Sequence, residues 1–193
     1  MRKIEPIAAR VPYQVSPGNH EIWFNFSAYK NRFVMPDNGT NDALYHNHVV
    51  GNRIHFIGMD TEAFWDTAYM NPRQISFIQN ELESSPDDKW RICFGHRPLY
   101  ASNHGGADIP AGYYYLRKKI ESTLNKYKIN LVLQAHEHDY ERSWPVSNNG
   151  TVWQTNYTSP NAPVYVVNGA AGNREAEPTP PGKMVWQPQD QNL

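Results

Sequence analysis

The sequence predicts a layered α/β fold, and three observations lead to that class. Apolar strand-like runs alternate with amphipathic helical segments through the middle of the chain, as they do where strands and helices pack in layers. A glycine-led turn between two alternating runs adds a β-hairpin. The 193 residues, 39% of them hydrophobic and 13% aromatic, suffice for one domain with a real core.

The hairpin is expected within residues 44–59, where hydrophobicity alternates on both sides of Gly51-Asn52. Before it, residues 7–15 end in an apolar piece that is typical of a strand and runs into "SPGNHE". After it, "KWRICFGHRPLY", "INLVLQAHEH" and "APVYVVNGAAG" each begin as an apolar strand and end at small residues. These strands supply the sheet of the predicted fold.

Two helices are expected between these strands. The first begins with Asn71 as N-cap and Pro72 at the first helical position. The second lies in "YYYLRKKIESTLNKYK". Their buried faces follow helical spacing and consist of Ile75, Ile78 and Leu82 in the first helix and Leu116, Ile120 and Leu124 in the second. Residues 176–193 are rich in Pro and Gln and are expected to form an irregular tail.

Charge and composition argue against several classes of partner. A formal net charge of −1 and a pI near 6.7 provide no electrostatic attraction for nucleic acid or an anionic membrane. No apolar stretch approaches the roughly 18 residues that a membrane span needs, and the amino-terminal residues do not form a signal peptide. The single cysteine, Cys93, excludes an intrachain disulfide or a thiolate cluster and is expected to be a buried, inert thiol.

Four Asn-x-Ser/Thr sequons favour a secretory origin, despite the missing signal peptide. The candidate glycosylation sites are Asn25, Asn38, Asn149 and Asn156.

Histidines recur just beyond the ends of the predicted strands, in "VSPGNHE", "RICFGHRPLY" and "LVLQAHEH". If these strands are neighbours in the sheet, His20, His96, His136 and His138 converge at one edge. Oxygen and nitrogen donors without thiolates suit iron, zinc or manganese. Two such ions about 3.5–4 Å apart would clamp a phosphoryl group and lower the pKa of a bound water.

Each histidine also has a simpler interpretation. A single histidine after a strand, or the charged run "HEHDYER", is commonly a solvated loop. His46, His48 and His55 lie on the predicted hairpin and are expected at the surface. Only the joint recurrence at three strand ends favours a metal site.

The stretches "PGNHE", "FGHRPLY", "LVLQAHEHDYERSWPV" and "APVYVVNGAAGNRE", in this order, resemble purple acid phosphatases of the metallophosphoesterase superfamily. The resemblance implies that residues 1–175 are a partial catalytic domain, an incomplete β-sandwich flanked by helices. It also implies a centre of Fe(III) and a divalent ion (Zn, Fe or Mn) that hydrolyses small phosphate monoesters at acidic pH. The full-length form would be secreted, extracellular or lysosomal.

The resemblance also assigns roles to individual residues. Asn19, His96 and His136 match ligands of the divalent ion, and His138 matches the histidine on the ferric ion. The resemblance makes His20 the histidine that contacts the substrate phosphate and protonates the leaving alkoxide. The remaining matches are His104 as a second substrate-side histidine, and Tyr140 and Arg142 as supports of the loop that carries His136 and His138.

The main departure from the family is that the eighteen residues before Asn19 contain no Asp. The family's two aspartate ligands and its tyrosinate lie in motifs upstream of "GNHE", so the chain is expected to be truncated at its amino end. Without a bridging carboxylate, the repulsion between two cations is uncompensated. We therefore expect the chain alone to be inactive or nearly so, with one divalent ion at most. A non-catalytic fragment and a phosphodiesterase on the same scaffold remain alternatives.

Overall fold

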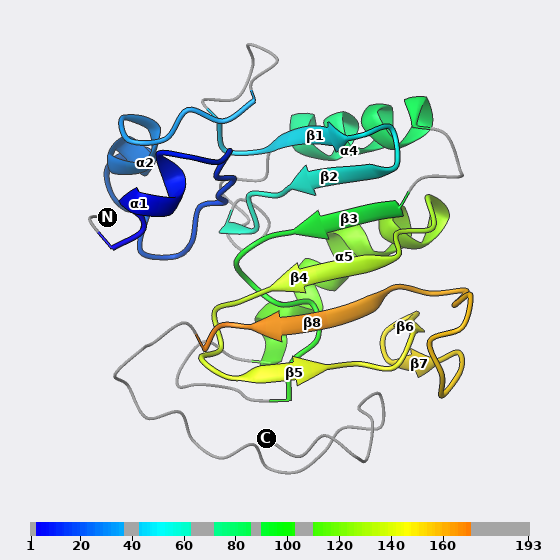
Figure 1. Ribbon diagram of the computed structural model, residues 1–193. Helices are drawn as coiled ribbons and strands as arrows, with labels where there is room; N and C mark the ends of the chain where they lie inside the picture. The colour runs from blue at the N-terminus through cyan, green and yellow to red at the C-terminus, as the bar shows by residue number, and fades with distance from the viewer. Residues whose placement is uncertain (1–2, 37–42, 63–71, 86–89, 103–109, 171–193) are drawn as a thin grey trace.

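The computed structural model describes residues 3–36, 43–62, 72–85, 90–102 and 110–170 (Figure 1). The helices are α1 (Glu5–Ala8), α2 (Trp23–Lys30), α4 (Pro72–Ser84) and α5 (Pro110–Lys126). The first strands are β1 (His46–Val50), β2 (Ile54–Gly58), β3 (Trp90–Phe94) and β4 (Leu131–Gln134). The later strands are β5 (Tyr140–Arg142), β6 (Val146–Ser147), β7 (Thr151–Val152) and β8 (Val164–Asn168).

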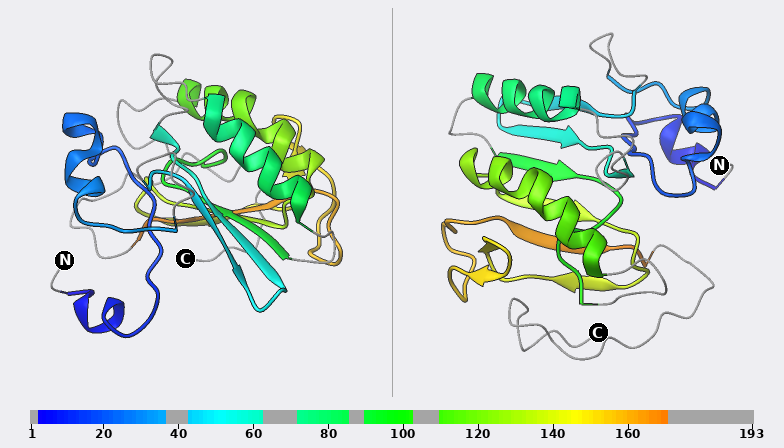
Figure 2. Two further views of the ribbon diagram at one scale, coloured as in Figure 1. Left: turned by 90° about the horizontal axis from the view of Figure 1, so that it is seen from above. Right: turned by 180° about the vertical axis from the view of Figure 1, so that it is seen from behind.

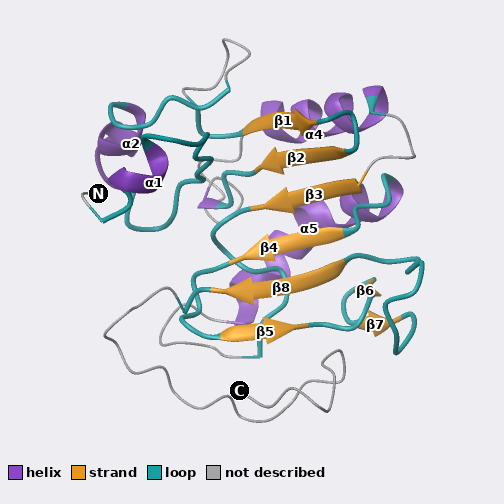
Figure 3. Cartoon of the chain, viewed as in Figure 1, coloured by secondary structure: helices purple, strands orange, loops and turns teal. Residues whose placement is uncertain are grey.

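Six strands form one mixed sheet in the order β1-β2-β3-β4-β8-β5. Strands β2, β3, β4 and β8 are parallel, and the edge strands β1 and β5 are antiparallel to their neighbours. Helices α4 and α5 both lie against the same face of this sheet (Figure 2). Strands β6 and β7 form a separate two-stranded ribbon (Figure 3). The predicted α/β layering is confirmed.

Local sequence explains the hairpin and the helix faces. Gly51 and Asn52 have φ of 55° and 56°, which is the backbone of a tight turn between antiparallel strands. In α5, the three predicted positions Leu116, Ile120 and Leu124 are fully buried. In α4, two of the three predicted positions, Ile78 and Leu82, are fully buried, whereas Ile75 is partly exposed. Asn71, the expected N-cap, lies outside the described residues.

None of the described helices is long and apolar enough to cross a bilayer.

Residues 7–15 do not form the expected strand. Instead, α1 occupies residues 5–8, with Pro6 in its first turn, a position where the missing N–H of proline costs no hydrogen bond. The following residues form an irregular segment with Val11 and Tyr13 exposed. In this segment the Val15 N–H lies 3.3 Å from Met35 Sδ, a contact outside any strand ladder.

His46 and His55 are buried, with 2% and 3% of their surface exposed, so the prediction that both are surface residues is wrong. The His46 ring lies edge-on to Phe94, and its Nε2 is 2.9 Å from the carbonyl oxygen of Val15. The His55 side chain lies 4.0 Å from Glu81 of α4. The two rings are covered from different sides, His46 by the amino-terminal segment and His55 by a helix. His48 is only partly buried.

The sheet face opposite α4 and α5 carries no described helix (Figures 1 and 2). Phe56, Phe94 and Leu133 line a hollow of about 400 Å³ there, and Leu133 is 37% exposed. An apolar surface of this kind is normally covered in a folded domain.

The burial of His46 predicts a pH-dependent stability. Burial lowers the pKa of His46 below its ordinary value of 6.5. As the pH falls below 6.5, the unfolded chain binds a proton that the folded chain does not bind. The free energy of unfolding should therefore decrease, until the pH reaches the pKa of the folded state. His46→Gln cannot titrate and retains an N–H for the Val15 carbonyl. Urea unfolding should show a smaller decrease in this variant than in the wild type; equal decreases would contradict the prediction.

Candidate metal centre

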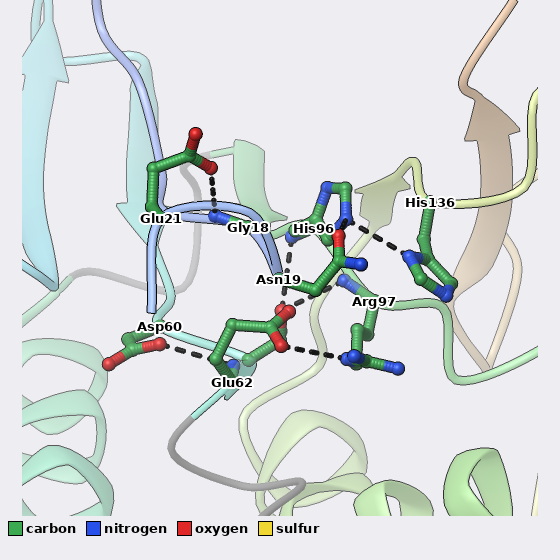
Figure 4. A network of polar contacts seen from close by, with 9 residues as sticks. Gly18, Asn19, Glu21, Asp60, Glu62, His96, Arg97 and His136 are labelled. Carbon is green, nitrogen blue, oxygen red and sulfur yellow. Dashed lines mark hydrogen bonds and ion pairs between the residues drawn. The ribbon is translucent and has the colours of Figure 1, made fainter. Parts of the chain in front are cut away.

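Three chain segments meet at the carboxyl ends of β3 and β4 (Figure 4). His96 Nε2 lies 2.9 Å from Asn19 Oδ1 and 3.1 Å from His136 Nδ1. The two imidazole rings meet nearly edge to face, with centroids 5.0 Å apart. These residues are separated by 77 and 40 positions in the sequence, and the fold brings them together. Of the four histidines expected to converge, His96 and His136 are in direct contact.

The parallel pairing of β3 and β4 explains this convergence, because carboxyl ends of parallel neighbours share one edge of the sheet. The pairing continues past the strands, since Ala135 N–H donates to the His96 carbonyl oxygen at 2.9 Å. On the third segment, a Cβ added at Gly18 would lie 2.9 Å from the His96 ring. Glycine therefore permits the Asn19 turn to approach the imidazole closely.

Residues 135–139, between β4 and β5, form the loop that carries His136 and His138, which we call the ligand loop. Its residue His136 is in a left-handed conformation, with φ of 71°, a backbone that a β-carbon disfavours. Ala135, directly before it, does not have positive φ.

His96 is held in its neutral form. Burial, and after it the charges of His136, Arg97, His20 and His138, lower the pKa of His96 to about 3. A neutral imidazole nitrogen is the form that binds a metal ion. Since His20 and His138 contribute to this lowering, both lie close enough to His96 to act on it electrostatically.

The other predicted site residues lie around this core. His20 is exposed and directly follows Asn19, and His138 is half-buried two residues after His136. In the part of the chain that the structure describes, no three His, Cys, Asp or Glu side chains form a ligand cluster. Among the described residues, His96, His136 and His138 therefore do not form a cluster of three metal-binding histidines. His104 lies outside the described residues.

Tyr140 and Arg142 lie on β5, paired with Asn168 and Val166 of β8. The Arg142 guanidinium lies 4.9 Å from the centre of the Tyr157 ring. Both side chains thus belong to the edge strand that follows the ligand loop. Among the sequons, Asn25, Asn149 and Asn156 are exposed, and Asn38 lies outside the described residues.

A polar group that sequence reasoning missed lies beside the three donors. Directly after β2, Asp60, Thr61 and Glu62 are buried, and Arg97 next to His96 is buried with them. Glu62 Oε2 accepts a hydrogen bond from Arg97 Nε at 2.8 Å (Figure 4). The sequence contains a sign of this group, because the acidic stretch "MDTE" directly follows the apolar strand β2. In the structure, β2 runs parallel to β3, the strand that precedes His96.

Gly169, just after β8, is a second residue whose role was missed. A Cβ added there would lie 1.8 Å from the carbonyl oxygen of Glu137. The Gly169 N–H also donates to the Asp139 carbonyl oxygen at 3.1 Å. The backbone of the ligand loop therefore rests directly on this glycine.

The donor atoms fit one divalent cation. One amide oxygen and two imidazole nitrogens face one another, and such oxygen and nitrogen donors suit zinc, manganese or iron. Of the two carboxylates that follow β2, Glu62 accepts a hydrogen bond from Arg97, and Asp60 accepts one from the Glu62 N–H. The converging donors are thus all neutral.

The chain is similar to several known proteins. Residues 1–140 match the calcineurin-like phosphoesterase family. The chain is 38% identical to human acid phosphatase type 7 and 37% identical to the mouse protein, over 91% of this chain and 43% of each relative. It is 31% identical to probable inactive purple acid phosphatase 9 of Arabidopsis thaliana, over 96% of this chain and 31% of that protein.

The structure of purple acid phosphatase PPD1 from yellow lupin seeds superposes with a TM-score of 0.78 and 26% identity. That match covers 96% of this chain and 35% of the lupin chain. The chain therefore spans less than half the length of each of these relatives. It belongs to the calcineurin-like phosphoesterase family and is related to acid phosphatase type 7 and the purple acid phosphatases.

Proposed function

We propose that this chain carries the histidine-rich part of a metal centre that hydrolyses phosphate monoesters. The observation that supports the proposal is the convergence of Asn19, His96 and His136 within 2.9 and 3.1 Å at one edge of the sheet. The relatives named acid phosphatases extend this to phosphoric monoesters as the substrate class.

Asn19, His96 and His136 would hold a divalent ion, Zn, Fe or Mn, and His138 would contribute to the adjacent Fe(III) site. When bound, such ions polarise the phosphoryl oxygen and lower the pKa of a bound water. The protein's own contribution is to keep the donor groups neutral and directed at one point. Burial keeps His96 neutral by lowering its pKa to about 3.

His20 is the proposed proton donor to the leaving alkoxide. It is exposed and directly follows Asn19, so a substrate phosphate near the metal centre can reach it. The Gly18 N–H donates to Glu21 Oε2 at 2.9 Å, which closes the turn that carries both residues. A rigid turn favours catalysis because proton transfer requires the donor within hydrogen-bond reach of the leaving oxygen. His104 is proposed as a second substrate-side histidine.

A second candidate function is binding of a single divalent ion without turnover. The all-neutral donor set favours it, because one divalent ion needs less compensating charge than two adjacent ions. One relative is named a probable inactive purple acid phosphatase. Phosphodiester hydrolysis remains a further alternative for the substrate.

The deciding experiment loads the purified chain with Fe³⁺ and Zn²⁺. Calorimetry then measures metal binding. Turnover is measured at mildly acidic pH with p-nitrophenyl phosphate as the monoester and bis(p-nitrophenyl) phosphate as the diester. We expect one divalent ion to bind and turnover to be negligible in the chain alone. Monoester turnover that disappears in His96→Ala would contradict the inactivity and identify a working centre. Absence of any metal binding would contradict the proposed site.

We also propose that the complete protein is a secreted or lysosomal glycoprotein. Its support is that three of the four sequon asparagines, Asn25, Asn149 and Asn156, are exposed. At Asn156, the side-chain oxygen accepts the Thr158 N–H at 3.0 Å. A change in electrophoretic mobility after glycosidase digestion tests this; an unchanged mobility contradicts it.

A further inference from the structure

One buried hydroxyl accepts hydrogen bonds from two successive backbone amides at the metal centre. Thr61 Oγ1 lies 3.1 Å from the His96 nitrogen and 2.8 Å from the Arg97 nitrogen. Thr61 is fully buried. Both lone pairs of the hydroxyl oxygen are therefore used by the backbone that carries the His96 imidazole.

The backbone of His96 is held from two neighbouring strands. Its N–H donates to Thr61, just past the end of β2, and its carbonyl oxygen accepts from Ala135, just past the end of β4. The direction of the His96 side chain depends on this backbone segment, and Gly18 limits the ring from the third side. A shift of the segment would move Nε2 away from Asn19 and His136.

Thr61 itself is fixed by its neighbours. A Cβ at Gly95 would lie 2.6 Å from the Thr61 methyl group, so the methyl fills the space that glycine leaves. The buried Glu62–Arg97 ion pair links the residues that follow Thr61 and His96. On the other side, the main chain of Asp60 forms two hydrogen bonds with the Gln74 side chain of α4, at 2.8 and 3.0 Å.

We propose that Thr61 is a positioning residue for His96: its hydroxyl fixes the backbone of His96 and so aims the imidazole at the shared metal position. This inference rests on the proposed function, because it takes His96 as a ligand. Groups that orient a metal ligand commonly change metal affinity 10- to 100-fold when removed. A threonine that served packing alone would affect folding and leave affinity unchanged.

The test uses the 193-residue chain and titration of Co²⁺ and Zn²⁺. Thr61→Val keeps the shape but removes the acceptor, and should lower metal affinity about 10- to 100-fold. Thr61→Ser keeps the hydroxyl and should bind close to the wild-type level. Thr123→Val is the matched control, since Thr123 is buried in α5, near the chain that enters the amino end of β4. It should leave metal affinity unchanged.

Amide hydrogen exchange provides a readout without metal. In Thr61→Val, the His96 and Arg97 amide protons should exchange faster relative to the Cys93 amide in β3, whereas in Thr61→Ser they should remain protected. Wild-type affinity in a folded Thr61→Val chain would overturn the inference, and so would an equal loss of affinity in Thr61→Ser. If the wild type binds no metal, the proposed function fails. In that case exchange decides the role of Thr61 separately: unchanged exchange of the His96 and Arg97 amides in Thr61→Val would overturn the inference. If Thr61→Val does not fold, Thr61→Ser decides by affinity and exchange.

Discussion

Replacing His96 with alanine is expected to weaken Zn²⁺ or Co²⁺ binding by more than about a hundredfold, because removing a ligand should cost more than removing its support. The His96 Nε2 is the atom that approaches both Asn19 Oδ1 and His136 Nδ1. Its loss leaves two donors from separate segments without a common centre. Titration calorimetry of the wild-type and variant chains measures the effect.

The control for this experiment is His48→Gln. His48 is a partly buried histidine in the middle of β1, and β2 separates this strand from β3, which precedes His96. It should bind metal as the wild type does. Equal affinities in wild type and His96→Ala, with both chains folded, would show that the ion binds elsewhere.

Replacing Gly169 with alanine is expected to destabilise the folded chain by more than about 4 kcal/mol, a loss reserved for severe steric or packing defects. The added Cβ would lie 1.8 Å from the carbonyl oxygen and 2.8 Å from the carbonyl carbon of Glu137, and 3.3 Å from the Cα of His138. All three atoms belong to the backbone, so no side-chain rotation can relieve the overlap. Urea unfolding of the two chains measures the loss.

The matched control is Gly51→Ala. Gly51 has φ of 55° in the hairpin turn, and a Cβ there would meet no atom within 4 Å. It should therefore cost only the strain of a left-handed backbone, about 1–2 kcal/mol. A Gly169→Ala chain that is no less stable than Gly51→Ala would contradict the close packing of β8 on the ligand loop. If the Gly169→Ala chain still folds, its metal affinity should also fall, because His136 and His138 lie on the displaced loop.

The predicted elements that were confirmed are those with local physical causes. Gly51 and Asn52 adopt a left-handed backbone, and the local preference of Gly and Asn for it favours a tight turn at this position. The helical spacing of Leu116, Ile120 and Leu124 similarly marks the buried face of α5. The strand expected in residues 7–15 failed because a strand requires hydrogen-bonding partners as well as apolar residues. Its Val15 N–H instead meets a methionine sulfur.

The sequence alone identified the strand-end histidines as a possible site, because a repeated pattern at parallel strand ends implies convergence. It could not reveal how His96 is held. Thr61 and Gly169 are ordinary in sequence, and their importance comes from atoms brought to them across the sheet. The burial of His46 and His55 likewise depends on which segment covers each face. Periodicity is a property of neighbouring residues, whereas contacts between distant segments arise only when the sheet forms.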